Sequence, residues 1–448
     1  MNAPDIRFTM PSEQLRQISD AVLSRARRNG ATAAETEVSQ GFGQGVTVRK
    51  GEVETIEYNR DKGVTVTVYV GRRRGHASSV DTSPAALDAA VDKALTIARY
   101  TEEDDCAGLA DPDRLARDIP ELDLYHPWNV TVDEAIAIAQ RCESAALEVD
   151  RRVTNSEGAT VSAHEYEFVY ANTEGFTGGY RTSRHGISCS VIAEDNDSMQ
   201  RDYWYTSSRL SEELEAAESV GRAAGERSIR RLNARQLSTR SAPVMFEAPI
   251  ASSLIGHFVG AVSGGSLYRK SSFLLDSVGQ AVFAPHLRIS EQPHLPRGVA
   301  SAPFDDEGVA TVTRDVVLDG IVQGYFLGSY SARKLGLVTT GNAGGSHNLI
   351  VSHGDDDFAA LLRRMGTGLL VTELLGQGVN PVTGDYSRGA AGFWVEGGVI
   401  AYPVEEITIA GNLREIFLGI VAVGSDVDRR GARQTGSILI DDMTIAGA

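Results

Sequence analysis

A long alternation of β-branched and polar residues near the N-terminus limits the fold of this chain more than any other feature. The stretch GVTVRKGEVETIEYNRDKGVTVTVYVGRRRGHASS, residues 45–79, alternates valine, threonine and tyrosine with polar residues, and Gly51, Gly63 and Gly71 interrupt it. Such alternation with glycine turns is typical of antiparallel strands. The stretch therefore predicts an antiparallel meander, with the basic run 72–74 at a hairpin turn.

Helical patterns flank this meander on both sides. Apolar residues recur every three or four positions over 13–29, from 84 onward, over 131–149 and over 212–231. The expected N-caps are Ser12, Ser83, Thr131 and Ser211, and Glu134 completes a capping box with Thr131. Strand-like runs return between residues 154 and 208. The first half of the chain is therefore predicted to place helices on an antiparallel sheet, without βαβ alternation.

The second half of the chain has a different texture. After residue 244 glycine becomes frequent, charge becomes sparse, and short β-branched runs alternate with turns. Helical patterns remain only at 249–262, near 331–335 and at 356–365. Many short strands with glycine corners favour a curled or closed sheet. We therefore predict an α+β protein with an N-terminal α+β domain over 1–235 and a C-terminal β-rich, barrel-like domain over 236–448, joined by a linker at 233–243.

Composition excludes several classes of function. The 448 residues carry a net charge of −17, which repels a phosphate backbone, so no nucleic-acid partner is expected. The three cysteines form no C-x-x-C pair and indicate neither a disulfide framework nor a zinc knuckle. The N-terminus does not resemble a signal peptide, and the most apolar run, 416–424, is too short to cross a bilayer. A cytoplasmic protein without a membrane partner is expected.

The apolar segment APIASSLIGHFVGAVSGG, residues 248–265, carries a single histidine, His257. No acidic residue occurs between Glu247 and Asp276. A zinc site needs three or four ligands, and a zinc hydrolase also needs a base for the metal-bound water. The segment therefore predicts a helix with a packed or interface histidine rather than a metal site.

A second short motif, S-x-x-K, occurs at Ser331–Lys334. In penicillin-binding proteins this spacing lets a lysine deprotonate a serine nucleophile, but S-D-N and K-T-G motifs accompany it there and are absent here. The motif is therefore only weak support for a serine hydrolase.

Two polar stretches are interpreted as turns. The acids of FDDEG, residues 304–308, precede a strand-like run, so a turn is favoured over a cation site. In GVNPVTGDYSRGAAGFWVEGG, Asn380 and Asp385 have turn chemistry, and Arg388 is expected to pair with Asp385 across the bend.

Longer stretches carry a resemblance to a known family. Five stretches occur in order between residues 263 and 413: SGGSLYRKSSFLLDSVGQ, SAPFDDEG, YSARKLGLVTTGNAGGSHNL, GTGLLVTELLGQGVNPVTGDYSRGAAGFWVEGG and YPVEEITIAGNL. Together they resemble the TldD/PmbA family of peptidases, also called modulators of gyrase, and specifically its PmbA (TldE) branch. The resemblance covers nearly the whole chain.

The resemblance implies that the TldD branch carries H-E-x-x-x-H on the equivalent helix and a further cysteine near its C-terminus. In this chain the three helix positions fall on or near Gly256, His257 and Ala261, and the final segment RRGARQTGSILIDDMTIAGA has no cysteine. The chain thus departs from the catalytic branch at every ligand and at the base. The resemblance implies a non-catalytic subunit, with zinc in a TldD partner and with unfolded peptide held in a shared cleft.

From these observations we expect no catalytic, cofactor-binding or metal-binding residue in this chain. Dimerisation is expected through the C-terminal domain, with TldD or, in its absence, with a second copy. Two alternatives remain: a self-sufficient hydrolase that uses Ser331 and Lys334 or His257, and a non-proteolytic protein that binds gyrase. The candidate residues at the cleft or the partner contact are Leu254, His257, Phe258, Arg269, Asn342, Asn380, Asp385 and Arg388.

Overall fold

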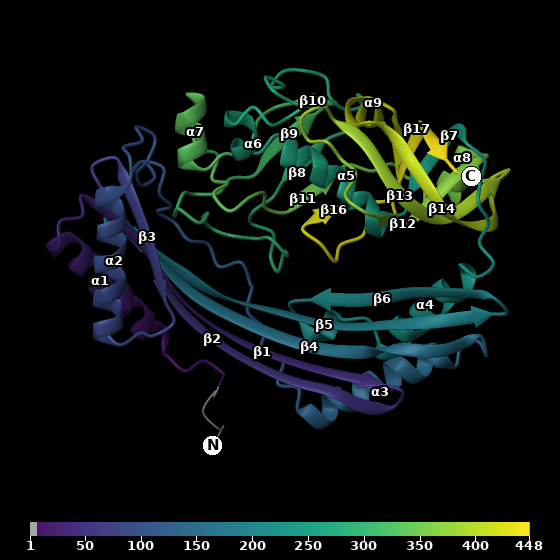
Figure 1. Ribbon diagram of the computed structural model, residues 1–448, viewed down its shortest axis with the longest axis horizontal. Coiled ribbons are helices and arrows are strands. Elements are labelled where there is room, and N and C mark those ends of the chain that lie inside the picture. The colour runs from purple at the N-terminus through teal and green to yellow at the C-terminus, as the bar shows by residue number, and fades with distance from the viewer. Residues whose placement is uncertain (1–6, 448) are drawn as a thin grey trace.

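A six-stranded antiparallel sheet forms the N-terminal half of the protein (Figure 1). The computed structural model describes residues 7–447. The strands lie in the order β3-β2-β1-β4-β5-β6, so the predicted meander is confirmed, although Gly63 lies inside β2 rather than at a turn. The bounds are β1 Ala33–Arg49, β2 Glu52–Val70, β3 Arg73–Ser79, β4 Val153–Asn172, β5 Thr177–Asp195 and β6 Ser198–Ser208.

Two pairs of helices cover the convex side of this curved sheet, one pair at each end (Figure 1). At one end the buried valines of β1 and β2 pack against α1 and α2. At the other end apolar residues of β4 and β5 pack against α3 and α4. The bounds are α1 Ser12–Arg28, α2 Pro84–Tyr100, α3 Val132–Leu147 and α4 Ala217–Arg230.

Two of the four predicted N-caps are confirmed. The Ser83 hydroxyl accepts a hydrogen bond from Ala86 N, and Thr131 forms the capping box with Glu134. The other two predictions are wrong. Ser12 lies inside α1, and its hydroxyl donates to the carboxylate of Glu167 instead of capping the helix. Ser211 begins a separate 3₁₀ turn, Ser211–Glu213, and α4 starts only at residue 217.

A closed barrel forms the core of the C-terminal half, which confirms the barrel-like prediction. Five strands close the ring because β14 pairs with both β13 and β17. The ring is mixed, since β7 and β12 are parallel. Strand β7 occupies residues assigned above to the linker. The bounds are β7 Arg240–Phe246, β12 Gly368–Leu375, β13 Asp385–Glu396, β14 Val399–Asn412 and β17 Ile438–Ala446, and β15 Ile420–Val423 extends the sheet beyond β17.

A second, smaller sheet and short helices complete this half. The sheet has the order β10-β9-β8-β11-β16, with β8 Ile289–Glu291, β9 Arg314–Leu318, β10 Ile321–Val322, β11 Leu349–Val351 and β16 Arg433–Gln434. The three expected helices are present as α5 Ala248–Ala261, α7 Ser329–Leu335 and α8 Phe358–Met365. Two more, α6 Gly264–Tyr268 and α9 Leu413–Leu418, were not predicted because five or six residues are too short to show a helical period.

The C-terminal half lies over the concave face of the N-terminal sheet (Figure 1). Side chains from the sheet bind the other half directly: Arg184 donates to the carbonyl of Arg430 at 2.8 Å, and Gln200 donates to Glu405 at 2.5 Å. Among the cavities between the halves, one lies at each end of the concave face. The concave face therefore has ligand-sized space, and a larger space of about 760 Å³ lies between α3 and α4 on the convex side.

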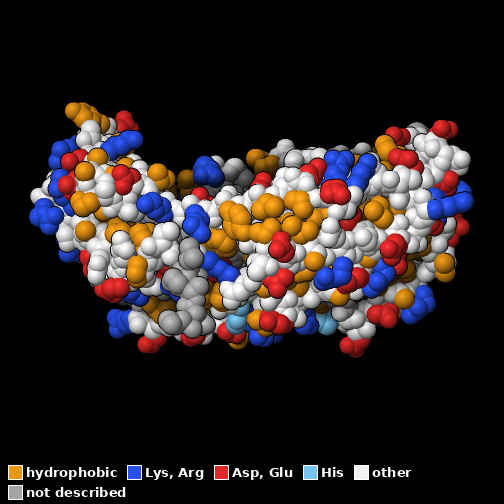
Figure 2. Space-filling model, turned by 90° about the horizontal axis from the view of Figure 1, so that it is seen from below, with side chains coloured by type: hydrophobic (Ala, Val, Ile, Leu, Met, Phe, Trp, Pro, Cys, Tyr) orange, Lys and Arg blue, Asp and Glu red, His pale blue; other side chains and the backbone are white. Residues whose placement is uncertain are grey.

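On the convex side of the N-terminal half, neither acidic nor basic side chains form a separate patch. Seen from below, acidic and basic side chains are interspersed around hydrophobic side chains near the middle of the molecule (Figure 2). Among residues 7–447, no helix combines the length and the apolar character that crossing a membrane requires.

Candidate functional site

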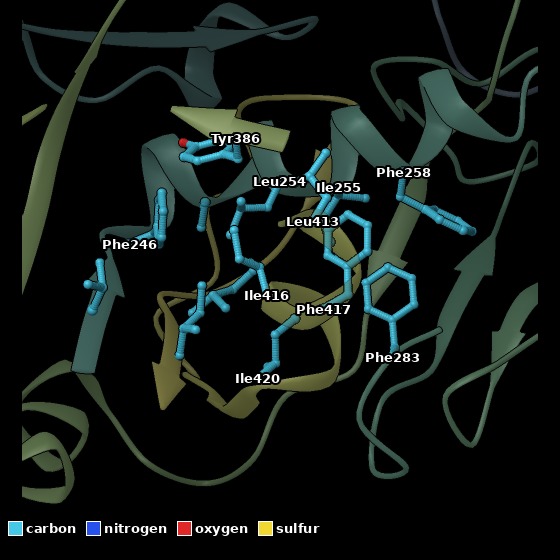
Figure 3. Packing of buried hydrophobic residues seen from close by; sticks show 14 of the residues in the cluster. Phe246, Leu254, Ile255, Phe258, Phe283, Tyr386, Leu413, Ile416, Phe417 and Ile420 are labelled. Atoms are coloured by element: carbon cyan, nitrogen blue, oxygen red, sulfur yellow. The ribbon is translucent and has the colours of Figure 1, made fainter. Parts of the chain in front are cut away.

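Helix α5 lies against the C-terminal core, with one face fully buried (Figure 3). Leu254 and Phe258 are 0% exposed, and the Phe258 ring packs edge-on against Phe283 at 5.0 Å between centroids. Both side chains are enclosed by the protein itself. They are core residues rather than cleft or partner contacts, which corrects the prediction for these two positions.

His257 lies on the other face of α5, as an isolated imidazole. Its ring stands edge-on to Tyr386 at 5.9 Å. Burial lowers the pKa of His257, and the positive charges of Arg388 and Arg433 lower it further. Arg433 approaches the helix so closely that a Cβ at Gly256 would lie 3.1 Å from its Nη1 atom. His257 is therefore neutral at pH 7 and lies in a positively charged setting.

This arrangement does not fit the zinc ion that the H-E-x-x-x-H motif would bind. Zinc requires three or four histidine, cysteine or carboxylate ligands around one point. Within residues 7–447, no three such side chains gather in a way that could hold a metal ion. Where further ligands would be needed, His257 has two guanidinium groups as neighbours. No step of any reaction is assigned to a metal on this helix.

A cavity of about 340 Å³ lies next to this face of α5, between the two halves of the chain. Strand β6 and α4 form one wall, and α5, β12 and β13 form the other. Trp204 and Tyr205 provide aromatic surface, on which Arg430 stacks at 4.2 Å and 4.4 Å from the ring centroids. Ser253 and Arg388 line the opposite side.

Arg388 does not pair with Asp385, contrary to the prediction. Asp385 instead accepts hydrogen bonds from Thr383 Oγ1 at 2.6 Å and from Asn412 Nδ2 at 3.2 Å. Residues three apart on a strand point to opposite faces, so Arg388 points toward the cavity whereas Asp385 stays in the exposed turn. Asn380 belongs to the same exposed turn, where its side chain accepts from the backbone N–H of Val382 at 2.9 Å.

The remaining two candidates lie elsewhere. Arg269 is exposed just after α6, where its guanidinium stacks on the ring of Tyr268 at 5.2 Å. Asn342 is buried in a network under the second sheet, donating to Glu291 Oε1 at 2.7 Å and accepting from Arg314 Nη2 at 3.0 Å. Thus, of the eight candidates, only His257 and Arg388 lie together at the α5 face.

Sequence reasoning missed the buried acid at the centre of that network. Glu291 also accepts from His347 Nδ1 at 3.0 Å and pairs with Arg314 at 2.8 Å. Burial acts to raise the pKa of Glu291, but the bonds from His347 and the charge of Arg314 lower it overall. The partners are far apart in sequence, so no local pattern marks them.

The acids of FDDEG border the second cavity, of about 350 Å³, at the other end of the concave face. The turn interpretation is confirmed: Asp305 Oδ1 accepts from the backbone N–H groups of Glu307 and Val309, each at 2.9 Å. Burial, and the nearby charge of Glu307, raise the pKa of Asp305 to about 7. The turn thus contains a carboxyl group that titrates near neutral pH.

The geometry at Ser331 and Lys334 does not favour a serine hydrolase. The Ser331 hydroxyl donates to the carbonyl of Gly328 at 3.0 Å. Lys334 pairs with Asp104 at 2.9 Å, which raises the pKa of this lysine to about 12. A lysine held in its charged form cannot act as the general base that the motif requires.

Comparison with known proteins covers both halves of the chain. Family models match residues 34–98 (PmbA/TldA metallopeptidase domain 1), 125–232 (central domain) and 239–447 (C-terminal domain). Metalloprotease PmbA of Escherichia coli O157:H7 is 50% identical over 97% of each chain. The Metalloprotease PmbA homolog of Haemophilus influenzae is 48% identical over 97% of this chain and 96% of the relative.

Solved structures extend the comparison. A proposed modulator of DNA gyrase from Bacteroides thetaiotaomicron has a TM-score of 0.93 at 26% identity, covering 98% of this chain and 100% of that one. TldE from Thermococcus kodakarensis has a TM-score of 0.85 at 19% identity, covering 96% and 100%, and shares the fold. The three family models, the identity to PmbA and the shared architecture lead to one conclusion. The chain belongs to the PmbA/TldD metallopeptidase family.

Proposed function

We propose that this chain is the non-catalytic, TldE/PmbA-like subunit of a TldD/TldE-type zinc metallopeptidase. In this proposal a TldD-like partner holds the zinc, the chain has no metal or cofactor of its own, and the pair degrades or trims unfolded peptides and peptide precursors in the cytoplasm. The observation that carries the proposal is the half-buried face of α5, where a single imidazole lies near Arg388 and Arg433.

The charge at this face supports the proposal. A Zn²⁺ ion next to two uncompensated guanidinium groups experiences repulsion, and the site provides one nitrogen ligand where three or four are needed. Neighbouring carboxylates do not offset these charges, since Glu373 is bound to Arg231 and Glu247 to Arg227. Peptide hydrolysis by this chain alone would therefore need a catalytic group outside this helix.

The self-sufficient hydrolase is the weaker alternative. It would need a neutral Lys334 to activate Ser331, whereas the ion pair with Asp104 holds the lysine in its charged form. A neutral His257 could accept a proton from a nucleophile. Within the described residues, however, no serine, threonine or cysteine hydrogen-bonds to its buried Nε2 atom.

An exposed strand edge is a further observation in favour of a partner subunit. Strand β3 pairs with β2 only from Val64 to Val70, so the edge of β2 over residues 52–62 has no neighbouring strand within the described chain. All of these residues are exposed, including Ile56 at 47% and Tyr58 at 55%. Unpaired edges of this length form sheets with other chains. We propose this edge as part of the contact with the TldD-like subunit, in addition to the C-terminal domain.

The proposal is tested with the purified chain, first alone and then mixed with a TldD-like subunit from the same organism. Metal analysis, mass measurement in solution and hydrolysis of unfolded casein are recorded for each sample. We expect less than a tenth of an equivalent of zinc and no hydrolysis for the chain alone, and a heteromeric complex that hydrolyses casein when the partner is added.

Two variants of this chain are measured in the same way, one to test the strand edge and one as its control. Ile56→Lys should weaken assembly, whereas Val399→Lys, at an exposed residue of β14, should leave it unchanged. Stoichiometric zinc together with hydrolysis by the isolated chain would overturn the proposal. So would a failure of the two proteins to associate at micromolar concentration.

A further inference from the structure

Besides the Tyr386 hydroxyl, four buried polar atoms around the α5 face have no hydrogen-bond partner within the described residues. They are Ser253 Oγ and His257 Nε2 on α5, Thr372 Oγ1 on β12 and Arg388 Nε on β13. Buried polar groups in folded proteins are nearly always paired, and each unpaired one costs about 1–3 kcal/mol. Three of these atoms belong to residues that line one cavity, so the cavity offers unpaired polar groups to a ligand.

Three of the four side chains share one cavity, and His257 lies on the helix face next to it. Ser253, Thr372 and Arg388 line the same cavity, of about 340 Å³. Ser253 and His257 are four residues apart on α5 and so lie on the same helix face. The charge of Arg388 acts on His257, which places these two side chains close together as well. Thr372 is only 8% exposed, so its hydroxyl has little access to bulk water.

The chemistry of this cluster selects a negatively charged ligand. Arg388 offers N–H groups and a full positive charge, and the two hydroxyls can both donate. The acids that line the cavity are already neutralised, since Asp202 pairs with Arg227 and Arg231, and Glu373 pairs with Arg231. Arg388 forms no ion pair within residues 7–447. The cavity therefore has one uncompensated guanidinium group, which matches one carboxylate.

We propose that this cavity binds the carboxylate of a peptide, with Arg388 as its charge partner and Ser253 and Thr372 as hydroxyl donors. The proposal rests on the proposed role in peptide processing and names the part of the peptide that this subunit holds. A guanidinium group binds a carboxylate through two parallel N–H···O bonds, which gives orientation as well as affinity. Arg227 and Arg430 already stack on Trp204, so Ile250 and Leu374 provide the apolar surface for the side chain next to that carboxylate.

The carboxylate has two sources, the C-terminus of a peptide or an internal glutamate. Three pentapeptides distinguish them: acetyl-Ala-Ala-Phe-Ala-Leu as the free acid, the same peptide as the C-terminal amide, and acetyl-Ala-Glu-Phe-Ala-Leu amide. Binding of each to the purified full-length chain is measured by isothermal titration calorimetry. We expect at least one acidic peptide to bind ten-fold or more tightly than the neutral amide.

Variants test the named side chains. Arg388→Gln should remove the preference for the acidic peptide, and Thr372→Val, which removes only the hydroxyl, should reduce affinity several-fold. Arg363→Gln, at an exposed arginine of α8, is the matched control and should bind as the wild type does. Circular dichroism and thermal unfolding establish that each variant is folded.

The outcomes separate this proposal from the previous one. A preference for the free acid assigns the cavity to a C-terminus, and a preference for the glutamate peptide assigns it to an acidic side chain. Equal affinity for all three peptides, or an unchanged preference in folded Arg388→Gln, overturns the carboxylate site. The measurement needs neither zinc nor a partner subunit, so a failure of the casein assay with TldD leaves its result intact.

Discussion

At the scale of single residues, the burial of Asp305 has a consequence that can be measured. Its carboxyl is 3% exposed and accepts three backbone N–H bonds, from Glu307, Val309 and Ala343. Burial nevertheless raises the pKa of Asp305 to about 7. The folded protein therefore binds a proton that the unfolded chain releases between about pH 4 and pH 7.

This difference predicts a loss of stability with rising pH. Because the native state binds more protons in that window, the free energy of unfolding falls as pH rises through it, by up to about 4 kcal/mol for a shift of roughly three pKa units. Asp305→Asn cannot ionise, so its unfolding free energy should change less between pH 5 and pH 8. Urea titrations at both pH values measure this.

A control variant and a functional measurement accompany that test. Asp355→Asn, at an exposed residue after β11, should retain the pH dependence of the wild type. The paired variant Asp305→Asn with Asp306→Asn is predicted to alter stability, while any casein hydrolysis by the proposed complex with a TldD-like subunit should stay intact. An identical pH dependence in wild type and Asp305→Asn would contradict the raised pKa.

At the scale of elements, the contact between α3 and α4 depends on a glycine. A Cβ at Gly221 would lie 1.9 Å from the carbonyl oxygen of Cys142, which belongs to the backbone of the facing helix. Gly221→Ala therefore has to separate the two helices, and overpacking of this kind costs about 1–3 kcal/mol. We expect lower stability in urea unfolding, with a slope similar to that of the wild type.

A second helical glycine provides the comparison. Gly260 in α5 has no atom within 4 Å of the position of an added Cβ. Gly260→Ala should stabilise the protein by up to about 1 kcal/mol, because alanine has the higher helix propensity. The two Gly→Ala substitutions should thus change the free energy of unfolding in opposite directions. Equal changes would show that helix propensity outweighs the close approach of α3 and α4.

At the scale of the whole molecule, Arg209 connects the two halves. Its guanidinium donates to the carbonyl of Ser183 in the sheet at 3.1 Å and to the carbonyls of Gly298 and Val299 in the C-terminal half at 3.1 Å and 2.8 Å. Burial lowers the pKa of Arg209 to about 10, so the group stays charged at pH 7. Within residues 7–447 it forms no ion pair, and three carbonyl oxygens accept its hydrogen bonds.

Replacing this arginine should uncouple the halves. Arg209→Met leaves the three carbonyls without their donor, which should cost on the order of 3 kcal/mol. Differential scanning calorimetry should then show two transitions where the wild type shows one. Arg297→Met is the matched control, since its ion pairs with Asp123 and Glu213 cross the same interface at the surface and contribute little. A single transition in Arg209→Met would show that apolar contacts alone couple the halves.

The local features of this protein follow from its sequence by itself. The alternation over 45–79 predicted the meander, and Ser83 and Thr131 were correctly identified as N-caps, because a strand period and a cap bond involve only neighbouring residues. The long C-terminal motifs carried enough information to identify the PmbA/TldD family, which the comparisons confirmed.

Which residues meet in space was decided by the tertiary structure alone. Leu254 and Phe258 were expected at a cleft because α5 is apolar nearly all round, and such a helix gives no local sign of which face the core will cover. Arg388 was paired with the nearby Asp385, whereas the fold turns it toward Ser253 on α5. The cavity combines side chains from β6, α4, α5, β12 and β13, and their distances are set by how a curved sheet and a closed barrel pack, which no local pattern records.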